Sequence, residues 1–259
     1  MSATESASRQ AFTKPSGVSE QEWKLRVDLA ACYRLMAHYG WDDLIFTHLS
    51  VRVPGPKHHF LINPYGLMFQ EITASSLVKV DVDGELVEDA PGHGINPAGF
   101  TIHSAIHMAR EDAQAVLHLH ARDAVAVSAQ EDGLLPISQT AMLVYSRAAY
   151  HDYEGVALDL GERERLVRDL GDKDVLILRN HGVLTVGNTV PEAFILMYFL
   201  VKACEIQVSA QHNGKPRMPS PDAIETTRRQ SLDRMPETGK RAWPALLRML
   251  EHEDPSYKT

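Results

Sequence analysis

The sequence predicts an α/β protein, a three-layer α/β/α domain built around one mostly antiparallel central sheet. Short β-rich segments separated by Pro/Gly turns lie between residues 45 and 87, and helical and apolar strand-like segments alternate after them. With 259 residues, of which 44% are hydrophobic, the chain can bury a substantial core without disulfides. Its two cysteines, Cys32 and Cys204, stand far apart in apolar helical surroundings and are predicted to be buried, reduced thiols.

Composition argues against several classes of partner. The net charge is −8, and acidic and basic residues are mixed along the chain rather than grouped. Nucleic acids and anionic membranes need a basic patch, so neither partner is expected. No apolar run approaches the length of about 20 residues that crosses a bilayer, and the N-terminus lacks the apolar stretch of a secretory signal. The sequence therefore predicts a cytoplasmic protein.

The first part of the chain predicts an arm, a helix and a group of strands. Residues 1–18 are rich in Ser, Thr, Gly and Pro and are expected to form a flexible N-terminal arm. Ser19 and Glu22 have the spacing of a capping box, and the apolar period after them predicts a helix that stops at Gly40. The segments IFTHLSVRV, HHFLIN, SLVKVDVDG and ELV then predict antiparallel sheet, with an Asp-Gly hairpin turn at 83–84.

The second part of the chain predicts alternating helices and strands. A helix over about 98–110 leads into the apolar strand AQAVLHLH, which is followed by a helix over ARDAVAVSAQEDG. The helix GERERLVRDLG precedes the strands DVLILRN and GVLTVG, and Thr189 and Pro191 open a long helix. The main domain is expected to span residues 19–215. The more polar residues 216–259 predict a C-terminal helical extension with two weaker helices.

Three of the thirteen histidines are distinguished by their position. His118 and His120 are two residues apart at the end of a strand, so both side chains leave one face of the sheet and can chelate one ion. His181 lies in the tight turn Asn180-His181-Gly182 between two apolar strands, where a histidine gains nothing from packing. Three imidazoles leave a coordination position open, which is typical of a catalytic metal site. H-x-H pairs also arise by chance, so spacing alone leaves an accidental pair as the alternative.

Several runs of sequence point to a known family: VLHLHARDAVAVSAQEDGLLPIS, AAYHDYEG and VLILRNHGVLTVG, followed by EAF and ACEIQV. Together they resemble the class II aldolase/adducin family, and the similarity covers roughly residues 22–215. The resemblance implies the class II aldolase fold and a homotetramer with active sites near subunit interfaces. It implies that the H-x-H pair and the turn histidine bind one divalent ion, Zn²⁺ first, with Fe²⁺, Mn²⁺ or Co²⁺ as alternatives. The segment GFTIHSAIHMAR resembles adducin heads and their bacterial relatives more than it resembles sugar-phosphate aldolases.

The sequence departs from the sugar-phosphate aldolases where those enzymes bind and activate their substrate. The position that aligns with their acid/base glutamate is Gly99, which has no carboxylate. Pro97 and Ala98 stand where two serines of the family help to hold the substrate phosphate. An asparagine and a Thr-Gly turn of the same phosphate site are replaced by bulkier groups. We therefore expect a substrate other than a sugar phosphate.

Five further residues are candidates for the pocket. His48 stands where the aldolases have that asparagine, and it is the candidate to replace the lost acid/base, since an imidazole pKa of about 6.5 suits proton transfer near neutrality. Tyr65 and Gln139 are candidates to orient a substrate oxygen or a carboxylate, and Asn63 and Gly66 are assigned to substrate binding. A solvent-facing His48 on an edge strand, and loop packing of Tyr65 and Gln139, are the alternatives.

Two other groups contain histidines. His103 and His107 stand four residues apart on one helix face, a spacing that can bind metal. They lack an obvious third partner, so a packing or surface role is favoured. The adducin-like sequence also includes Tyr150, His151 and Asp152, and no chemistry follows from them.

Three functions are compatible with these residues. The first is a divalent-metal-dependent lyase, of aldolase or decarboxylase type, that acts on a small non-phosphorylated keto or hydroxy acid through a metal-stabilised enediolate. The second is a mononuclear non-haem iron oxygenase on the same scaffold, because three imidazoles hold Fe²⁺ as well as Zn²⁺. The third is a non-enzymatic, adducin-like module for the actin cytoskeleton. It ranks last because this chain keeps all three histidines and has no Lys-rich tail before Thr259.

Overall fold

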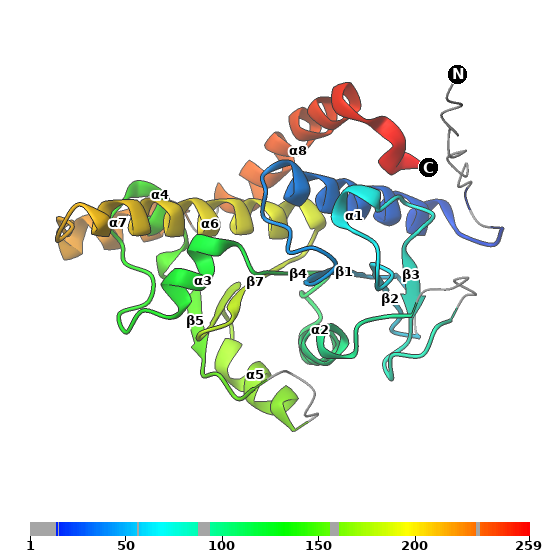
Figure 1. The fold of residues 1–259 in the computed structure, drawn as a ribbon, viewed down its shortest axis with the longest axis horizontal. Helices are drawn as coiled ribbons and strands as arrows, with labels where there is room; N and C mark the ends of the chain where they lie inside the picture. The colour runs from blue at the N-terminus through cyan, green and yellow to red at the C-terminus, as the bar shows by residue number, and fades with distance from the viewer. Residues whose placement is uncertain (1–13, 15, 56, 88–93, 156–160, 232–233) are drawn as a thin grey trace, which may run out of the picture.

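The computed structural model describes residues 14, 16–55, 57–87, 94–155, 161–231 and 234–259. Most of the predicted N-terminal arm, residues 1–18, lies outside the described residues, although Val18 at its end is buried. One sheet with helices on both faces makes up the described part of the chain (Figure 1). This arrangement confirms the predicted three-layer α/β/α class.

The sheet is built from seven strands in the described residues. They are β1 (His48–Arg52), β2 (Phe60–Ile62), β3 (Val78–Val80), β4 (Ala115–Leu119), β5 (Ala148–His151), β6 (Val175–Leu178) and β7 (Gly182–Gly187). Their order across the sheet is β3-β2-β1-β4-β7-β6-β5. All neighbouring strands are antiparallel except β5 and β6, which are parallel. The sheet is thus mostly antiparallel, as predicted, and segments distant in the sequence meet at its centre.

The helices form two unequal layers. They are α1 (Glu20–His38), α2 (Pro97–Ala109), α3 (Arg122–Ser128), α4 (Gln139–Tyr145), α5 (Glu162–Leu170), α6 (Val190–His212), α7 (Pro221–Ser231) and α8 (Arg234–Glu253), with 3₁₀ turns η1 (Phe69–Glu71) and η2 (Pro255–Lys258). α2 and α5 pack together on one face of the sheet, and α1, α3, α4 and α6 cover the other (Figure 1). α8 packs against α1 and α6 from outside.

The start of α1 shows how far the capping prediction holds. The Ser19 hydroxyl accepts a hydrogen bond from the backbone N–H of Glu22 at 3.1 Å, so Ser19 is the N-cap. The Glu22 carboxylate instead pairs with Arg26 at 2.9 Å and with Lys79 at 3.0 Å. Only half of the predicted capping box is therefore present. The helix ends as expected, just before Gly40, whose φ of +68° suits glycine after a helix.

The predicted hairpin at 83–84 is present, but its second arm is short. The Val87 N–H donates to the Lys79 carbonyl at 2.8 Å, and a single bridge joins Val80 and Leu86. The segment ELV therefore pairs with β3 without forming a strand of its own. α4 and β5 were not predicted from the sequence, because elements of seven and four residues are too short to show a clear period.

The predicted C-terminal extension, residues 216–259, is packed onto the rest of the molecule. Trp243 of α8 is buried, and its indole N–H donates to Asp28 of α1 at 2.9 Å. Tyr257 is fully buried, and its carbonyl accepts from the N–H of Ala74 at 2.9 Å. The extension therefore shares the large core around α1 and α6.

α6 is the central helix of the larger layer. Its 23 residues form a helix that is long and apolar enough to cross a membrane, by length and composition alone. This finding corrects the expectation that no apolar run reaches that length. More than half of its most apolar stretch is buried inside this fold, as in the core helix of a globular protein. Cys204 in α6 and Cys32 in α1 are free and buried, as predicted, and burial raises the pKa of the Cys204 thiol to about 12.

Candidate metal centre

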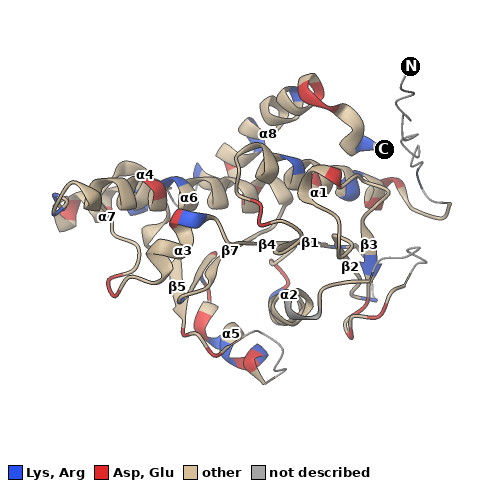
Figure 2. Cartoon of the chain, in the orientation of Figure 1, with Lys and Arg blue, Asp and Glu red and all other residues tan. Residues whose placement is uncertain are grey.

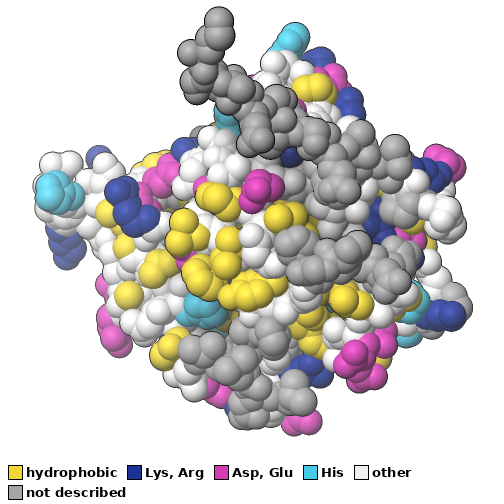
Figure 3. Space-filling model, turned by 45° about the vertical axis from the view of Figure 1, so that its right-hand side comes forward, with side chains coloured by type: hydrophobic (Ala, Val, Ile, Leu, Met, Phe, Trp, Pro, Cys, Tyr) yellow, Lys and Arg dark blue, Asp and Glu magenta, His cyan; other side chains and the backbone are white. Residues whose placement is uncertain are grey.

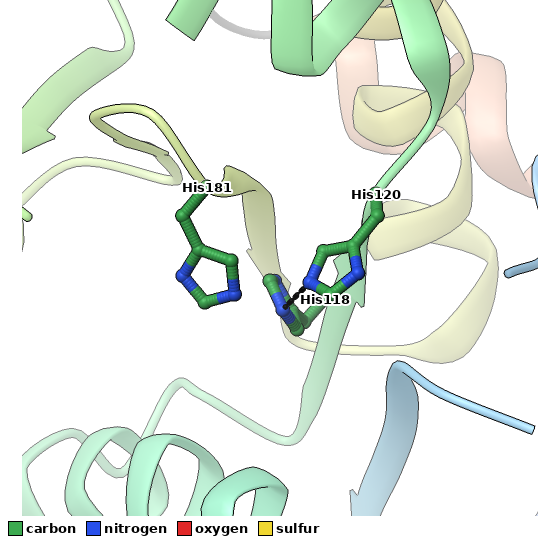
Figure 4. A group of neighbouring side chains, drawn as sticks. All are labelled: His118, His120 and His181. Carbon is green, nitrogen blue, oxygen red and sulfur yellow. Dashed lines mark hydrogen bonds between the residues drawn. The ribbon is translucent and has the colours of Figure 1, made fainter. Parts of the chain in front are cut away.

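Three histidines converge where β4 ends and β7 begins (Figure 4). His118 lies in β4, His120 follows that strand, and His181 lies in the turn between β6 and β7. Because β4 and β7 are antiparallel neighbours, the end of one lies beside the start of the other. The three ring centroids are 4.8 to 4.9 Å apart, and each ring offers one nitrogen within 4.8 Å of the others. The structure thus groups the three predicted metal ligands.

The turn that carries His181 depends on two backbone positions. Asn180 has a φ of +57°, in the left-handed region that asparagine tolerates better than most residues. A Cβ on Gly182 would lie 2.5 Å from the carbonyl oxygen of Leu119 and 3.0 Å from the ring of His120. Only glycine fits there. This close approach of the turn to the end of β4 brings His181 to the other two rings.

Hydrogen bonds fix the outer nitrogens of two of the rings. His118 Nδ1 lies 3.1 Å from the Val183 carbonyl oxygen, and His120 Nδ1 lies 2.9 Å from a carboxylate oxygen of Asp43. Both oxygens only accept, so each Nδ1 carries the proton and donates it. The two Nε2 atoms, 3.1 Å apart, then present lone pairs to each other. Tetrahedral zinc, with Zn–N near 2.0–2.1 Å, places two ligand nitrogens about 3.3 Å apart. The donor set therefore fits a divalent ion.

Burial keeps the rings of His118 and His181 neutral. Burial, followed by the nearby His120, lowers the pKa of His181 to about 4. Burial and the neighbouring histidines lower the pKa of His118 well below its ordinary value. A histidine must be deprotonated to bind a metal ion, so these rings need not lose a proton first at pH 7.

His48 begins β1 beside the three-histidine cluster. It pairs with His118 across the strands, and the two rings are stacked with centroids 6.4 Å apart. A Cβ built on Gly99 of α2 would lie 2.3 Å from the His48 ring. The ring therefore occupies the space that any side chain at position 99 needs, including the glutamate of the aldolases. The alternative of a solvent-facing His48 is wrong, because the residue is only 5% exposed.

The environment of His48 changes the basis of its predicted role. Burial, with smaller contributions from His120 and His181, lowers its pKa to about 3 rather than leaving it near 6.5. Neither ring nitrogen has a hydrogen-bond partner among the residues that the structure describes. His48 is therefore a neutral imidazole that can donate one hydrogen bond and accept another. Its part in acid/base chemistry stays a prediction.

The other predicted site residues are more widely spread. Asn63 follows β2, is buried, and its Oδ1 lies 2.8 Å from the hydroxyl of Tyr33. Tyr65 is 40% exposed, and Gly66 beside it has a φ of +104°. Gln139 starts α4, in the helical layer opposite α2, and its side chain is exposed. The roles of these residues in orienting or binding a substrate stay predictions.

Two carboxylate–histidine pairs near the cluster were not anticipated from the sequence. Asp43 lies in the loop after α1 and reaches His120 from 77 residues away. Asp169 of α5 holds Nδ1 of His151 at 2.8 Å, and His151 lines a small cavity together with His181. Metal-binding histidines commonly donate their other N–H to a carboxylate, so the three predicted ligands imply that an acidic partner lies nearby. Chain spacing does not indicate which carboxylate it is.

This arrangement of strands and histidines has known relatives. The family described as Class II Aldolase and Adducin N-terminal domain matches residues 27–208. The chain belongs to the class II aldolase and adducin family. The resemblance inferred from the sequence is thus confirmed. Class II aldolases typically use a divalent metal, often Zn²⁺.

Relatives within the class II aldolase and adducin family include named enzymes and adducins. An aldolase II superfamily protein from Pseudomonas syringae is 56% identical, with a TM-score of 0.90 over 93% of this chain and 98% of that structure. L-fuculose 1-phosphate aldolase from Glaciozyma antarctica PI12 is 28% identical, with a TM-score of 0.80 over 96% of this chain and 98% of its own. Alpha-adducin from Rattus norvegicus is 50% identical over 186 residues, which are 71% of this chain and 25% of the adducin. Family membership alone therefore does not name a reaction.

Proposed function

We propose that this protein is a divalent-metal-dependent lyase acting on a small non-phosphorylated hydroxy or keto acid. The observation that carries the proposal is the convergence of His118, His120 and His181, two of them with bare Nε2 atoms 3.1 Å apart. A divalent ion there, Zn²⁺ first among the candidates, would supply a Lewis acid for a carbonyl or hydroxyl oxygen of the substrate. A purely structural, adducin-like role has no use for such a donor set.

The residues around the three histidines have distinct tasks in this proposal. Asp43 and Val183 hold the outer N–H groups of two rings, which keeps their inner nitrogens available. His118 is buried, whereas His120 and His181 are partly exposed, so a substrate approaches from their side. On the buried side, the neutral His48 ring would donate a hydrogen bond to a substrate oxygen or accept one from a substrate hydroxyl.

The surroundings favour a neutral or weakly charged group over a phosphate. α2 carries no Lys or Arg, in contrast with α5 (Figure 2). The neutral His48 ring fills the space beside Gly99. A phosphate dianion is bound best by several cationic donors, and the sequence of α2 supplies none. The likeness to L-fuculose 1-phosphate aldolase, at 28% identity, makes cleavage of a sugar phosphate the second candidate.

We infer that the protein acts as a homo-oligomer, with a tetramer as the specific proposal. Class II aldolases are typically oligomers that bind small molecules. Leu44 and Phe46, in the loop that carries Asp43, are 63% and 40% exposed. Figure 3 shows apolar side chains gathered on one face of the molecule. Contiguous apolar surface marks interaction sites, so contact between copies would cover it. A monomeric mass by light scattering at micromolar concentration would contradict this assembly.

The test of the reaction compares two substrate classes on one preparation. Protein loaded with Zn²⁺, and separately with Fe²⁺ under air, is assayed with non-phosphorylated hydroxy and keto acids and with fuculose 1-phosphate. We expect cleavage of an acid and a rate on the phosphate lower by about 10²–10⁴, the usual effect of losing a positioned acid/base. Chelation and His118→Ala should abolish turnover, whereas substitution of the exposed His252 of α8 by Ala should not.

Two results would contradict the proposal in different ways. Fuculose 1-phosphate turnover at an ordinary enzymatic rate would overturn the substrate class and leave the lyase. Turnover that requires Fe²⁺ and consumes oxygen would replace the lyase with an oxygenase on the same three histidines.

A further inference from the structure

A chain of hydrogen bonds runs through the buried contact between α2 and β1. His103 and His107 lie four residues apart on α2, and Ser50 of β1 lies between them. Ser50 Oγ is 2.6 Å from His103 Nδ1 and 2.7 Å from His107 Nε2. All three residues are at most 2% exposed. The helical spacing of the two histidines therefore serves a buried serine rather than a metal ion.

The far end of this chain determines where each proton lies. His107 Nδ1 is 2.7 Å from the carbonyl oxygen of Ala113, which only accepts, so His107 donates from Nδ1. Burial lowers the pKa of His107 to about 3, so its Nε2 is bare at neutral pH and accepts the proton of Ser50. Ser50 has then used its only proton, and its oxygen accepts from His103 Nδ1. His103 is thereby left with a bare Nε2.

The bare nitrogen of His103 lies next to the ring of His48. It is buried and has no hydrogen-bond partner among the described residues, and the same holds for both nitrogens of His48. The two rings lie edge to face, with centroids 5.9 Å apart and planes at 84°. Buried polar atoms in folded proteins are almost always hydrogen-bonded. The two rings therefore require a small polar group that the described residues do not supply.

We propose that His48 and His103 form a binding site for one hydroxyl oxygen, beside the three-histidine cluster. The O–H of a bound water or of a substrate donates to Nε2 of His103, and its oxygen accepts the N–H of His48. A carboxylate or phosphate oxygen has no proton to donate, and α2 has no charged side chain to balance an anion (Figure 2). The site thus selects a hydroxyl over an anion, with Ser50 and His107 as positioning residues. Its assignment to a substrate hydroxyl rests on the proposed function.

Proton positions are tested by long-range ¹⁵N–¹H spectra of the full-length, zinc-loaded protein with ¹⁵N-labelled histidine. We expect the proton on Nδ1 of both His103 and His107. Ser50→Ala should release His103 into a mixture of its two tautomers. Ser104→Ala is the matched control. Ser104 lies next to His103 in α2, and its buried hydroxyl has no hydrogen-bond partner among the described residues. A wild-type His103 protonated on Nε2 overturns the proposal, as does a Ser50→Ala spectrum unchanged at His103. Where Ser50→Ala fails to fold, the wild-type spectrum decides.

Glycolate and acetate then identify the source of the hydroxyl, because they share a carboxylate and differ by one hydroxyl group. A shift of His103 Nε2 with glycolate but not with acetate assigns the site to a ligand hydroxyl. A hydrogen-bonded Nε2 that neither compound shifts assigns it to a bound water. An equal shift with acetate, or an Nε2 without a hydrogen bond in every sample, overturns the proposal. None of these signals depends on turnover, so failure of the lyase assay is recognised separately.

Discussion

The two faces of the central strands have opposite chemistry. Leu49 of β1 and Leu117 of β4 belong to the large apolar core under α1 and α6. Their neighbours His48, Ser50 and His118 point to the face that α2 covers. Side chains alternate between the faces of a strand, so one segment can supply stability from one side and chemistry from the other. Substitutions one residue apart should therefore have separable effects.

The largest separation is expected between adjacent residues of β4. Leu117→Ala removes a fully buried side chain and should lower the free energy of unfolding by about 2–5 kcal/mol, without touching a metal-binding nitrogen. His118→Ala should abolish tight binding of one ion per chain, with a smaller loss of stability in the metal-free protein. Urea unfolding and elemental analysis measure the two effects. If His118→Ala still bound one ion per chain, or if folded Leu117→Ala lost metal equally, the two faces of β4 would not have separate roles.

A smaller effect is expected at Asp43, which supports the cluster from outside the strands. Its carboxylate accepts the Nδ1–H of His120 at 2.9 Å. Asp43→Asn should weaken metal binding about 10–100-fold, the usual range for such partners, with stability nearly unchanged. Competition with a chelator measures the affinity. Asp42→Asn is the control, because Asp42 lines a different cleft with Arg34 and His38. Equal losses in both variants would show that the loop, rather than the Asp43 carboxylate, is responsible.

The last prediction concerns the dependence of the free energy of unfolding on pH, which is the smallest of these effects when it is counted per residue and per pH unit. Burial lowers the pKa of His48 and of His107 to about 3, against about 6.5 in an unfolded chain. Because the unfolded chain then binds protons that the folded chain does not, stability is complete above pH 6.5 and falls as the pH drops toward 3. The loss is about 1.4 kcal/mol per pH unit for each such histidine.

Urea unfolding of the metal-free protein at pH 7, 6 and 5 checks this dependence. Leu117→Ala should lower the free energy of unfolding at every pH by the same amount. The slope against pH should stay the same, because the substitution removes no titrating group. Equal stability at pH 7 and pH 5 would show that the histidine face is not buried in neutral form.

Local patterns were enough to group the three histidines but not to describe what surrounds them. The H-x-H spacing and the turn at His181 each depend on a few consecutive residues, so the sequence placed them at neighbouring strand ends. The pairing of Asp43 with His120 and the contact of Ser50 with α2 depend on which strands become neighbours. No local pattern determines that order across the sheet. Burial, too, is a property of the assembled fold, so the low pKa of His48 could not be anticipated.

The same distinction applies to the fold. α1 and α6 were predicted because both are long and begin at side-chain caps, Ser19 and Thr189. β5 was missed because it has only four residues, which show no alternation of apolar and polar side chains. Its place is determined by parallel pairing with β6, a contact between Tyr150 and Ile177 that the intervening chain does not suggest.

The tight fit between Gly99 and His48 constrains how such a site can evolve. A Cβ at position 99 would lie 2.3 Å from the imidazole ring of His48, which is only 5% exposed. A glutamate at 99 is therefore compatible only with a smaller residue at 48, and the histidine at 48 only with glycine at 99. Either exchange alone produces a collision or a hole beside the three histidines. We therefore expect the two positions to be epistatic: a mutational path from Gly99 and His48 to a glutamate at 99 has to cross a defective intermediate or change both codons together.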